Sequence, residues 1–371
     1  MPVKPREQTA GARRIRRHGW AALVSALAGC GYFHTVTTTL ARGTAATSAS
    51  SIAPSVLYAG TDAQEASVDQ GGNVWIATQS GVRCFTQGGL RSFNHAADGL
   101  TTDQVRTAAG GRSGEALVGF GAQGVPGQDN PAQLNYLTLS GLTLSGAGVG
   151  VEAYHFNLTT EIVQANHAVY DPARNQFWIG TNEGISLFDS ARDVLEHRHP
   201  VHPHGFTNGV AITAYGDVWN GDEFQLSKLN SGPQATFDGP FDPVLKPLPL
   251  DQQNFSALSL DAQERVWAGS LSQGLALVDG QALTSQLWTL AAGLPSLAVQ
   301  AVAVDPDGSV WVGTADEGLG RLDPSSGNWQ QYDSTSGLGS NEVRSLYVDR
   351  TSSPRRLVIT TGAGVETYDG P

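Results

Sequence analysis

The feature that most constrains the fold is a short motif that recurs along the chain, in which an apolar residue, most often Trp, is followed by mostly small residues. Consecutive copies start 41 to 48 residues apart, except for one separation of 61. A period of this length is typical of a repeat protein built from one structural unit. The seven copies are Trp75-Ile76-Ala77-Thr78, Leu117-Val118-Gly119-Phe120, Trp178-Ile179-Gly180-Thr181, Trp219-Asn220-Gly221-Asp222, Trp267-Ala268-Gly269-Ser270, Trp311-Val312-Gly313-Thr314 and Val358-Ile359-Thr360-Thr361.

Each clear copy of the motif lies in the same local pattern of apolar runs and turns. An Asp-led turn such as that at Asp305 precedes the Trp run, because an Asp side chain can cap its own turn. A Gly and a second apolar run follow, as in GLGRLD at 318–323, and a polar turn then leads to an aromatic run such as WQQYD at 329–333. Four runs in each unit predict a four-stranded antiparallel sheet, which is the blade of a β-propeller.

Seven copies predict seven blades, with the Trp side chains filling the spaces between them. The last unit ends one strand short, whereas the apolar run PSVLYAG at 54–60 has no unit of its own. We expect this run to supply the fourth strand of the last blade, so that the ring has no free edge. The expected fold is therefore all-β: a seven-bladed β-propeller over residues 54–371, closed by an N-terminal strand.

The N-terminal segment predicts export and a lipid anchor. Six basic residues precede the apolar run WAALVSALAG at 20–29, which is too short to cross a bilayer. The run ends in Leu27-Ala28-Gly29-Cys30, which resembles the lipobox of bacterial lipoproteins, where the Cys is acylated. We therefore expect a signal peptide over 1–29, lipidation at Cys30, and a flexible tether of small polar residues over 30–53.

Charge and cysteine content limit the partners of the exported chain. Removal of residues 1–29 changes the formal net charge from −12 to −17, which disfavours nucleic acid and anionic lipid as partners. Contact with a membrane is thus expected through the lipid only, and Gly31 after Cys30 favours the outer membrane over the inner one. With Cys30 acylated, Cys84 is the remaining thiol, and its apolar run GVRCFTQ predicts burial.

Polar residues in the loops of one face form the candidate site. In a propeller, the loops between second and third strands and the loops between blades share one face around the central channel. Acidic and amide groups there can bind sugar hydroxyls or a cation, or act only as turn residues. The candidates are Asp98, Glu183, His204, Asn208, Asp222, Glu223, Asp316 and Glu317.

Two segments depart from the repeat. The string EHRHPVHPHG at 196–205 holds four of the nine His residues, but no carboxylate or Cys at a ligand spacing completes a metal site, so we expect an outer-edge strand and no metal. The second unit carries an insertion at 121–150, which we expect to form a hairpin or flap beside the face. No cofactor-binding or catalytic motif is present, which favours a binding protein over an enzyme.

The repeats resemble a known family. The segment VQAVAVDPDGSVWVGTADEGLGRLDPSSGNWQQYDSTSGLGSNEV at 299–343 looks like the two-component regulator propeller repeat, and the likeness is weak only in the second and fourth units. Propellers of that family are usually extracytoplasmic sensors of hybrid histidine kinases and often respond to oligosaccharides. The resemblance implies a propeller that binds a partner or ligand outside the cytoplasm, here expected as a stand-alone lipoprotein because kinase and receiver regions are absent from this sequence.

Three functions stay open on the sequence. The first is a membrane-anchored recognition propeller that binds a small ligand, an oligosaccharide or a peptide, or senses a partner for a separate signalling protein. The second is a scaffold in an envelope protein assembly. The third is an enzyme that resembles the streptogramin lyases, in which a His and a Glu act together; His204 with Glu183 or Glu223 is the pair to test.

Overall fold

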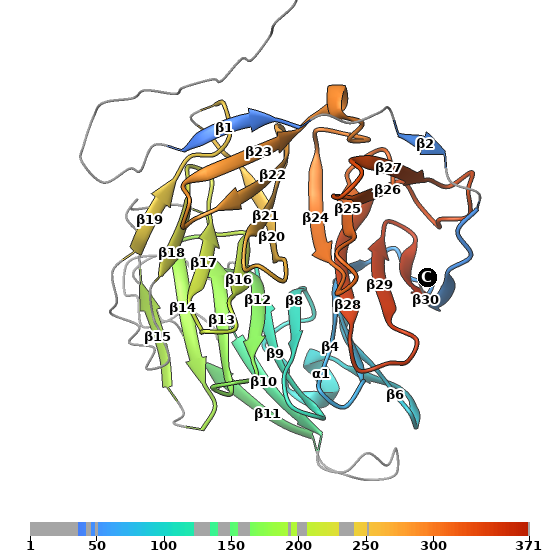
Figure 1. The fold of residues 1–371 in the computed structure, drawn as a ribbon. Helices are drawn as coiled ribbons and strands as arrows, with labels where there is room; N and C mark the ends of the chain where they lie inside the picture. The colour runs from blue at the N-terminus through green and yellow to red at the C-terminus, as the bar shows by residue number, and fades with distance from the viewer. Residues whose placement is uncertain are drawn as a thin grey trace, which may run out of the picture.

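The computed structural model shows seven sheets arranged in a ring (Figure 1), each with four antiparallel strands, and two of them carry a fifth, parallel strand at the rim. This confirms the predicted seven-bladed β-propeller. Besides the strands, the described part of the chain contains one short helix, α1 (His95–Asp98), and one 3-10 turn, η1 (Leu290–Ala292). The structure describes residues 36–41, 46–48, 51–121, 134–139, 149–154, 164–191, 194–198, 206–229, 241–250 and 252–369.

In the first six blades the strands follow one another in chain order from the channel to the rim. The first three blades are β4 (Ala63–Val68), β5 (Val74–Thr78), β6 (Gly81–Thr86) and β7 (Gly89–Phe93); β8 (Val105–Gly110), β9 (Glu115–Phe120), β10 (Leu134–Leu139) and β11 (Val149–Tyr154); and β12 (Ala165–Asp171), β13 (Gln176–Thr181), β14 (Gly184–Asp189) and β15 (Val194–Arg198). The next three are β16 (Gly209–Ile212), β17 (Val218–Gly221), β18 (Leu226–Leu229) and β19 (Phe241–Leu245); β20 (Phe255–Leu260), β21 (Val266–Ser270), β22 (Gly274–Asp279) and β23 (Thr284–Trp288); and β24 (Val299–Val304), β25 (Val310–Thr314), β26 (Leu319–Asp323) and β27 (Asn328–Tyr332).

The seventh blade joins the two ends of the propeller. It consists of β28 (Val343–Asp349), β29 (Arg356–Thr361), β30 (Gly364–Asp369) and, outermost, β3 (Ser55–Tyr58). Strand β3 pairs antiparallel with β30, with Val56 opposite Glu366. The apolar run at 54–60 therefore closes the ring as predicted.

Trp side chains fill the seams between neighbouring blades, as the motif predicted. Trp75, Trp178, Trp267 and Trp311 are all at most 2% exposed. Each packs against the inner strands of the next blade; Trp267, for example, lies in one core cluster with Val299. Loss of such a side chain costs about 3–5 kcal/mol in buried sites generally.

The small third residue of the motif has a packing reason. A Cβ atom placed on Gly313 would lie 2.5 Å from Cγ1 of Val343 in the next blade, and one on Gly269 would lie 2.5 Å from Cγ1 of Val299. The second strand of a blade can approach the next blade this closely only where the side chain is absent or very small.

The segment expected to be a flexible tether is different in the structure. Strand β1 (Thr37–Leu40) pairs parallel with β23, and β2 (Thr47–Ser48) pairs parallel with β27, so both lie along the rim (Figure 1). Val36 and Ile52 are buried in the cores between the fourth and fifth and between the sixth and seventh blades. We call the described parts of residues 36–52 the rim strap.

Several expectations fall outside the described residues. The predicted signal peptide at 1–29 and Cys30 lie there, as do His204 and most of the His-rich string. Within the expected flap at 121–150, residues 134–139 form β10, the third strand of the second blade, so this part is blade rather than flap. The outer-edge strand predicted for the His-rich string is present in its described part, because residues 196–198 belong to β15 (Val194–Arg198), the outermost strand of the third blade. No helix among the described residues is long and apolar enough to cross a membrane.

Candidate binding site in the central channel

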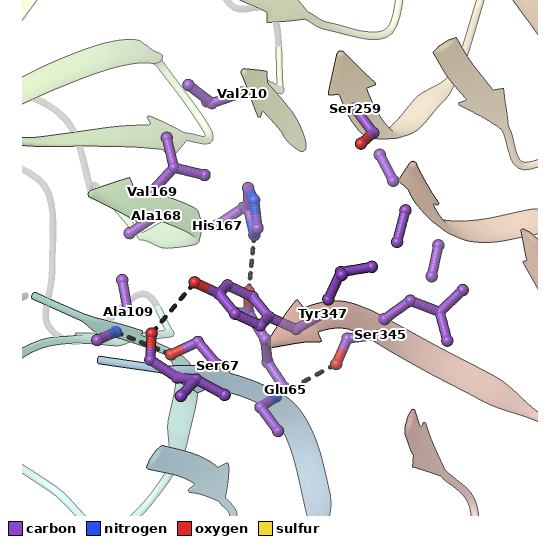
Figure 2. Close-up of a pocket in the computed structure, with 18 of the residues that line it drawn as sticks. Glu65, Ser67, Ala109, His167, Ala168, Val169, Val210, Ser259, Ser345 and Tyr347 are labelled. Carbon is purple, nitrogen blue, oxygen red and sulfur yellow. Dashed lines mark hydrogen bonds and ion pairs between the residues drawn. The ribbon is translucent and has the colours of Figure 1, made fainter. Parts of the chain in front are cut away.

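The innermost strands of all seven blades line one cavity of about 800 Å³, which is the central channel. Figure 2 shows part of its wall, including Glu65 and Ser67 of β4, His167 of β12 and Tyr347 of β28. A cavity of this size is within the range of small-molecule binding sites. Its chemistry is set by which residue of each inner strand faces inward.

A ring of seven polar side chains surrounds one mouth of the channel. In six blades the ring residue is an extra residue near the start of the inner strand, where the pairing register shifts by one. Such a β-bulge re-aims the side chain away from the regular pleat. The polar ring consists of Gln64, Arg106, Asn166, Asn208, Ser256, Gln300 and Arg344, and all seven line the channel.

Four members of the polar ring join their blade to the next. Asn166 Nδ2 donates to the carbonyl of Thr207 (3.1 Å), and Asn208 Nδ2 donates to the carbonyl of Phe255 (3.3 Å). Each acceptor immediately precedes the ring residue of the following blade. Ser256 Oγ and Arg344 Nη1 make the same bond across their own seams, to the carbonyls of Val299 (2.6 Å) and Ala63 (2.6 Å) respectively. These four side chains therefore have a structural role.

The other three members of the polar ring make no such bond across a seam. Gln64 Nε2 donates to the carbonyl of Asp62 within its own blade (3.1 Å). Gln300 Oε1 is shielded from solvent and has no hydrogen-bond partner, and Arg106 makes no hydrogen bond or ion pair with another described residue. These three positions leave hydrogen-bonding capacity at the mouth.

A Glu–His ion pair crosses the channel wall below the ring. His167 Nδ1 lies 2.8 Å from Glu65 Oε1 (Figure 2). This contact joins the first and third blades on the channel side of the second blade. The second blade presents Ala109 and Gly110 to the channel, which leaves room for this contact. Burial acts to lower the pKa of His167, but the charge of Glu65 and their hydrogen bond outweigh it, so the pKa lies above its ordinary 6.5.

Most other polar groups in the wall are used within the fold. Tyr347 Oη donates to the carbonyl of Val68 (3.1 Å) (Figure 2). Ser67 Oγ donates to the carbonyl of Ala108 (2.6 Å). Ser345 Oγ accepts from the backbone N–H of Ala66 (3.2 Å). No group of three or more metal-ligating side chains occurs among the described residues.

Of the predicted site residues that the structure describes, only Asn208 lines the channel. Asp222 is fully buried, and its Oδ1 accepts from the backbone N–H groups of Phe224 (2.6 Å) and Gln225 (2.8 Å). At the equivalent position of the first blade, the hydroxyl of Thr78 accepts from the backbone N–H of Ser80 (3.1 Å). This carboxylate therefore caps a turn inside the blade, and contact of Asp222 with a ligand stays a prediction.

The other predicted residues that the structure describes are not among those that line the channel. Asp98 is half-buried and accepts from the backbone N–H of Asn94 (2.9 Å), which fixes the start of α1. Glu183 lies in the turn between β13 and β14, and the Glu223 carbonyl accepts from the N–H of Gln253 (2.6 Å). Asp316 and Glu317 are exposed in the turn between β25 and β26. His204 is outside the described residues, so its proximity to Glu183 or Glu223 stays a prediction.

The sequence did not predict the polar groups inside the channel. Glu65, Arg106 and His167 lie in or near the starts of inner strands, whereas the predicted site residues lie in loops. The signal was present in the position that they occupy, near the start of the first apolar run of each unit. It was weak because the equivalent residues differ in chemistry from one blade to the next.

Comparison with known proteins supports the fold and the repeat. Residues 293–316 match the family model described as two component regulator propeller, which confirms the resemblance drawn from the repeats. No curated protein is significantly similar to the chain. Fold and channel together define a seven-bladed propeller that carries this repeat.

Solved structures share the architecture at low sequence identity. The extracellular domain of BT3049, a proposed hybrid two component system of B. thetaiotaomicron, has a TM-score of 0.62 and 17% identity over 84% of this chain and 40% of its own. PorZ, a surface component of the type-IX secretion system of Porphyromonas gingivalis, has a TM-score of 0.60 and 16% identity. The match covers 83% of this chain and 46% of PorZ. Streptogramin B lyase has a TM-score of 0.61 and 10% identity, and the match covers 85% of this chain and 96% of the lyase. The chain thus spans less than half of the first two proteins, and these identities show the fold alone.

Proposed function

We propose that this chain is a binding or recognition propeller whose ligand enters the mouth of the central channel. The supporting observation is the polar ring, in which Gln64, Arg106 and Gln300 keep hydrogen-bonding capacity that the seams do not use. Amide and guanidinium groups around a cavity of about 800 Å³ suit a small polar ligand such as an oligosaccharide or a short peptide.

We place this activity outside the cytoplasm, on a chain anchored by a lipid at Cys30 in the outer membrane. The leader and lipobox of the sequence support this placement, and the structural likeness to an extracellular domain and to a surface component agrees with it. A ligand-dependent contact with a separate signalling protein would then pass the signal onward.

Thermal unfolding of the full chain tests the proposal, because a ligand that binds only the folded state raises the melting temperature. The ligands are a panel of neutral oligosaccharides and short peptides. Gln300→Trp places an indole at the mouth without breaking a seam bond, and Gln87→Trp, in an exposed turn at the rim, is the matched control. We expect a rise for the unaltered chain and for Gln87→Trp but not for Gln300→Trp. An equal rise in both variants would contradict a site at the mouth.

A scaffold is the second candidate, and the rim favours it. Strands β7, β11, β15 and β19 are outermost in the first four blades, and no other described strand covers them, whereas β23 and β27 are covered by the rim strap. Uncovered strand edges can pair with a strand of a partner protein. Cross-linking in the native envelope to a partner at these edges, with no ligand effect at the channel, would favour this function.

A further inference from the structure

Two arginines occupy the same position in the polar ring but have opposite surroundings. In the seventh blade, Arg344 donates to the carbonyls of Thr61 (3.0 Å) and Ala63 (2.6 Å) and to both carboxylate oxygens of Glu342 (2.9 and 3.1 Å). In the second blade, Arg106 is exposed and makes no hydrogen bond or ion pair with another described residue. Arg106 is therefore an uncompensated cation at the channel mouth.

The imidazole of His167 also presents an unused group to the channel. Its Nδ1 is held by Glu65 at 2.8 Å, and its side chain is 31% exposed. No described residue bonds to Nε2. Because the carboxylate keeps a proton on Nδ1, the protonated ring has its second N–H, on Nε2, available to a ligand.

These two groups lie at one corner of the mouth. Glu65 and His167 directly follow the ring residues of the first and third blades, and Arg106 is the ring residue of the second blade between them. This corner holds two cations and one carboxylate, whereas Arg344 and Glu342 neutralise each other in the seventh blade. The corner has a net positive charge inside a chain that is acidic overall.

We propose that this corner binds a carboxylate group of the ligand, held between the guanidinium of Arg106 and the Nε2–H of His167. This inference rests on the proposed function, since it names the chemistry of the ligand at that site. A guanidinium presents two parallel donors that match the two oxygens of a carboxylate. A dianion such as phosphate fits less well, because Glu65 and Glu342 line the same channel and repel the second charge.

Binding of the carboxylate depends on pH through His167. Above its pKa the imidazole loses the Nε2 proton, so Nε2 changes from a donor to an acceptor that repels the ligand oxygen. Glu65 raises the pKa of His167 against the effect of burial, which keeps the ring charged past its ordinary 6.5. The other titratable or charged groups lining the channel are Arg106, Arg344, Glu342, Tyr170, Tyr347, Asp69, Asp349 and Arg350.

Ligand-observed NMR titration of the full chain tests the inference with small probes. D-glucuronate is compared with D-glucose, and N-acetylglycine with N-acetylglycinamide, so that a carboxylate on a sugar and one on a peptide end are assessed separately. The variants are Arg106→Gln, which installs the amide found in two other blades, and His167→Gln, which keeps a donor for Glu65. Arg91→Gln removes the same charge from rim strand β7 and is the control.

We expect at least one carboxylate to bind about tenfold more tightly than its neutral analogue at pH 6, and the preference to fall about tenfold at pH 8.5. Arg106→Gln and His167→Gln lose the preference, and Arg91→Gln keeps it. Equal binding of charged and neutral probes, absence of binding by both carboxylates, or an unchanged preference in Arg106→Gln would overturn the inference. Binding of neutral sugars that Gln300→Trp abolishes would still leave the proposed function in place.

Discussion

Asp222 in the fourth blade caps the turn that a hydroxyl caps in five others. The equivalent side chains are those of Thr78, Thr181, Ser270, Thr314 and Thr361, each of which accepts from a backbone N–H two or three residues later. A carboxylate has one more oxygen than the hydroxyl that it replaces, and the turn does not use it. This second oxygen, Asp222 Oδ2, is buried without a hydrogen-bond partner. The sequence showed an acidic residue in a loop, but only the structure shows that its chemistry is directed into the blade.

The buried carboxyl of Asp222 makes stability depend on pH. Burial raises its pKa from 3.8 to about 6, against the two backbone hydrogen bonds that lower it, so the folded state holds the proton more tightly than the unfolded state. Stability is therefore greatest below the unfolded pKa and falls as pH rises from about 4 to about 6. We expect Asp222→Asn to remove this loss and to raise the free energy of unfolding at pH 8 by up to about 3 kcal/mol relative to the unaltered chain.

Urea unfolding at pH 4 and pH 8 checks this prediction. Asp316→Asn, at an exposed position in the corresponding turn of the sixth blade, is the control and should change stability little at either pH. If Asp222→Asn had the same effect at pH 4 as at pH 8, the carboxyl of Asp222 would not be the source of the pH dependence.

At the scale of elements, the blades were predictable and the rim strap was not. The blades carry a repeating pattern, because the Trp motif with its mostly small third residue and the Asp-led turn meet packing and turn requirements that recur from blade to blade. The strap has no such repeat: it is mostly Thr, Ser and Ala, and it pairs through its backbone. Its two anchoring side chains, Val36 and Ile52, are single apolar residues in a polar segment. Such isolated residues give no periodic signal.

The strap should contribute to stability through Ile52. This side chain is 3% exposed and packs with Trp311 and Leu338 in the core between the sixth and seventh blades. Ile52→Ala should lower the free energy of unfolding by about 2–4 kcal/mol, because it leaves a cavity in that core. Val56→Ala in β3 is the control, since Val56 is 66% exposed. Equal, small effects of both variants in thermal or urea unfolding would show that the strap is not packed in solution.

For the whole molecule, ring closure brings the site together. Residues from all seven inner strands line the channel, so Glu65 and His167, about a hundred positions apart in sequence, lie 2.8 Å apart in space. Closure itself followed from the sequence, because one strand was missing at the C-terminal end and one was spare at the N-terminal end. The inward-facing chemistry did not follow, because it depends on where each bulge places the ring residue, and a bulge has no pattern of its own.

The central claim is that the ligand binds at the ring mouth of the channel and not at the rim. Hydrogen–deuterium exchange of the full chain, with and without a ligand found by the thermal screen, tests this claim most directly. We predict slower exchange with ligand in peptides that cover the starts of β8, β12 and β24, and unchanged exchange in β7 and β15. Protection confined to those outer strands or to the rim strap would contradict the claim and favour the scaffold.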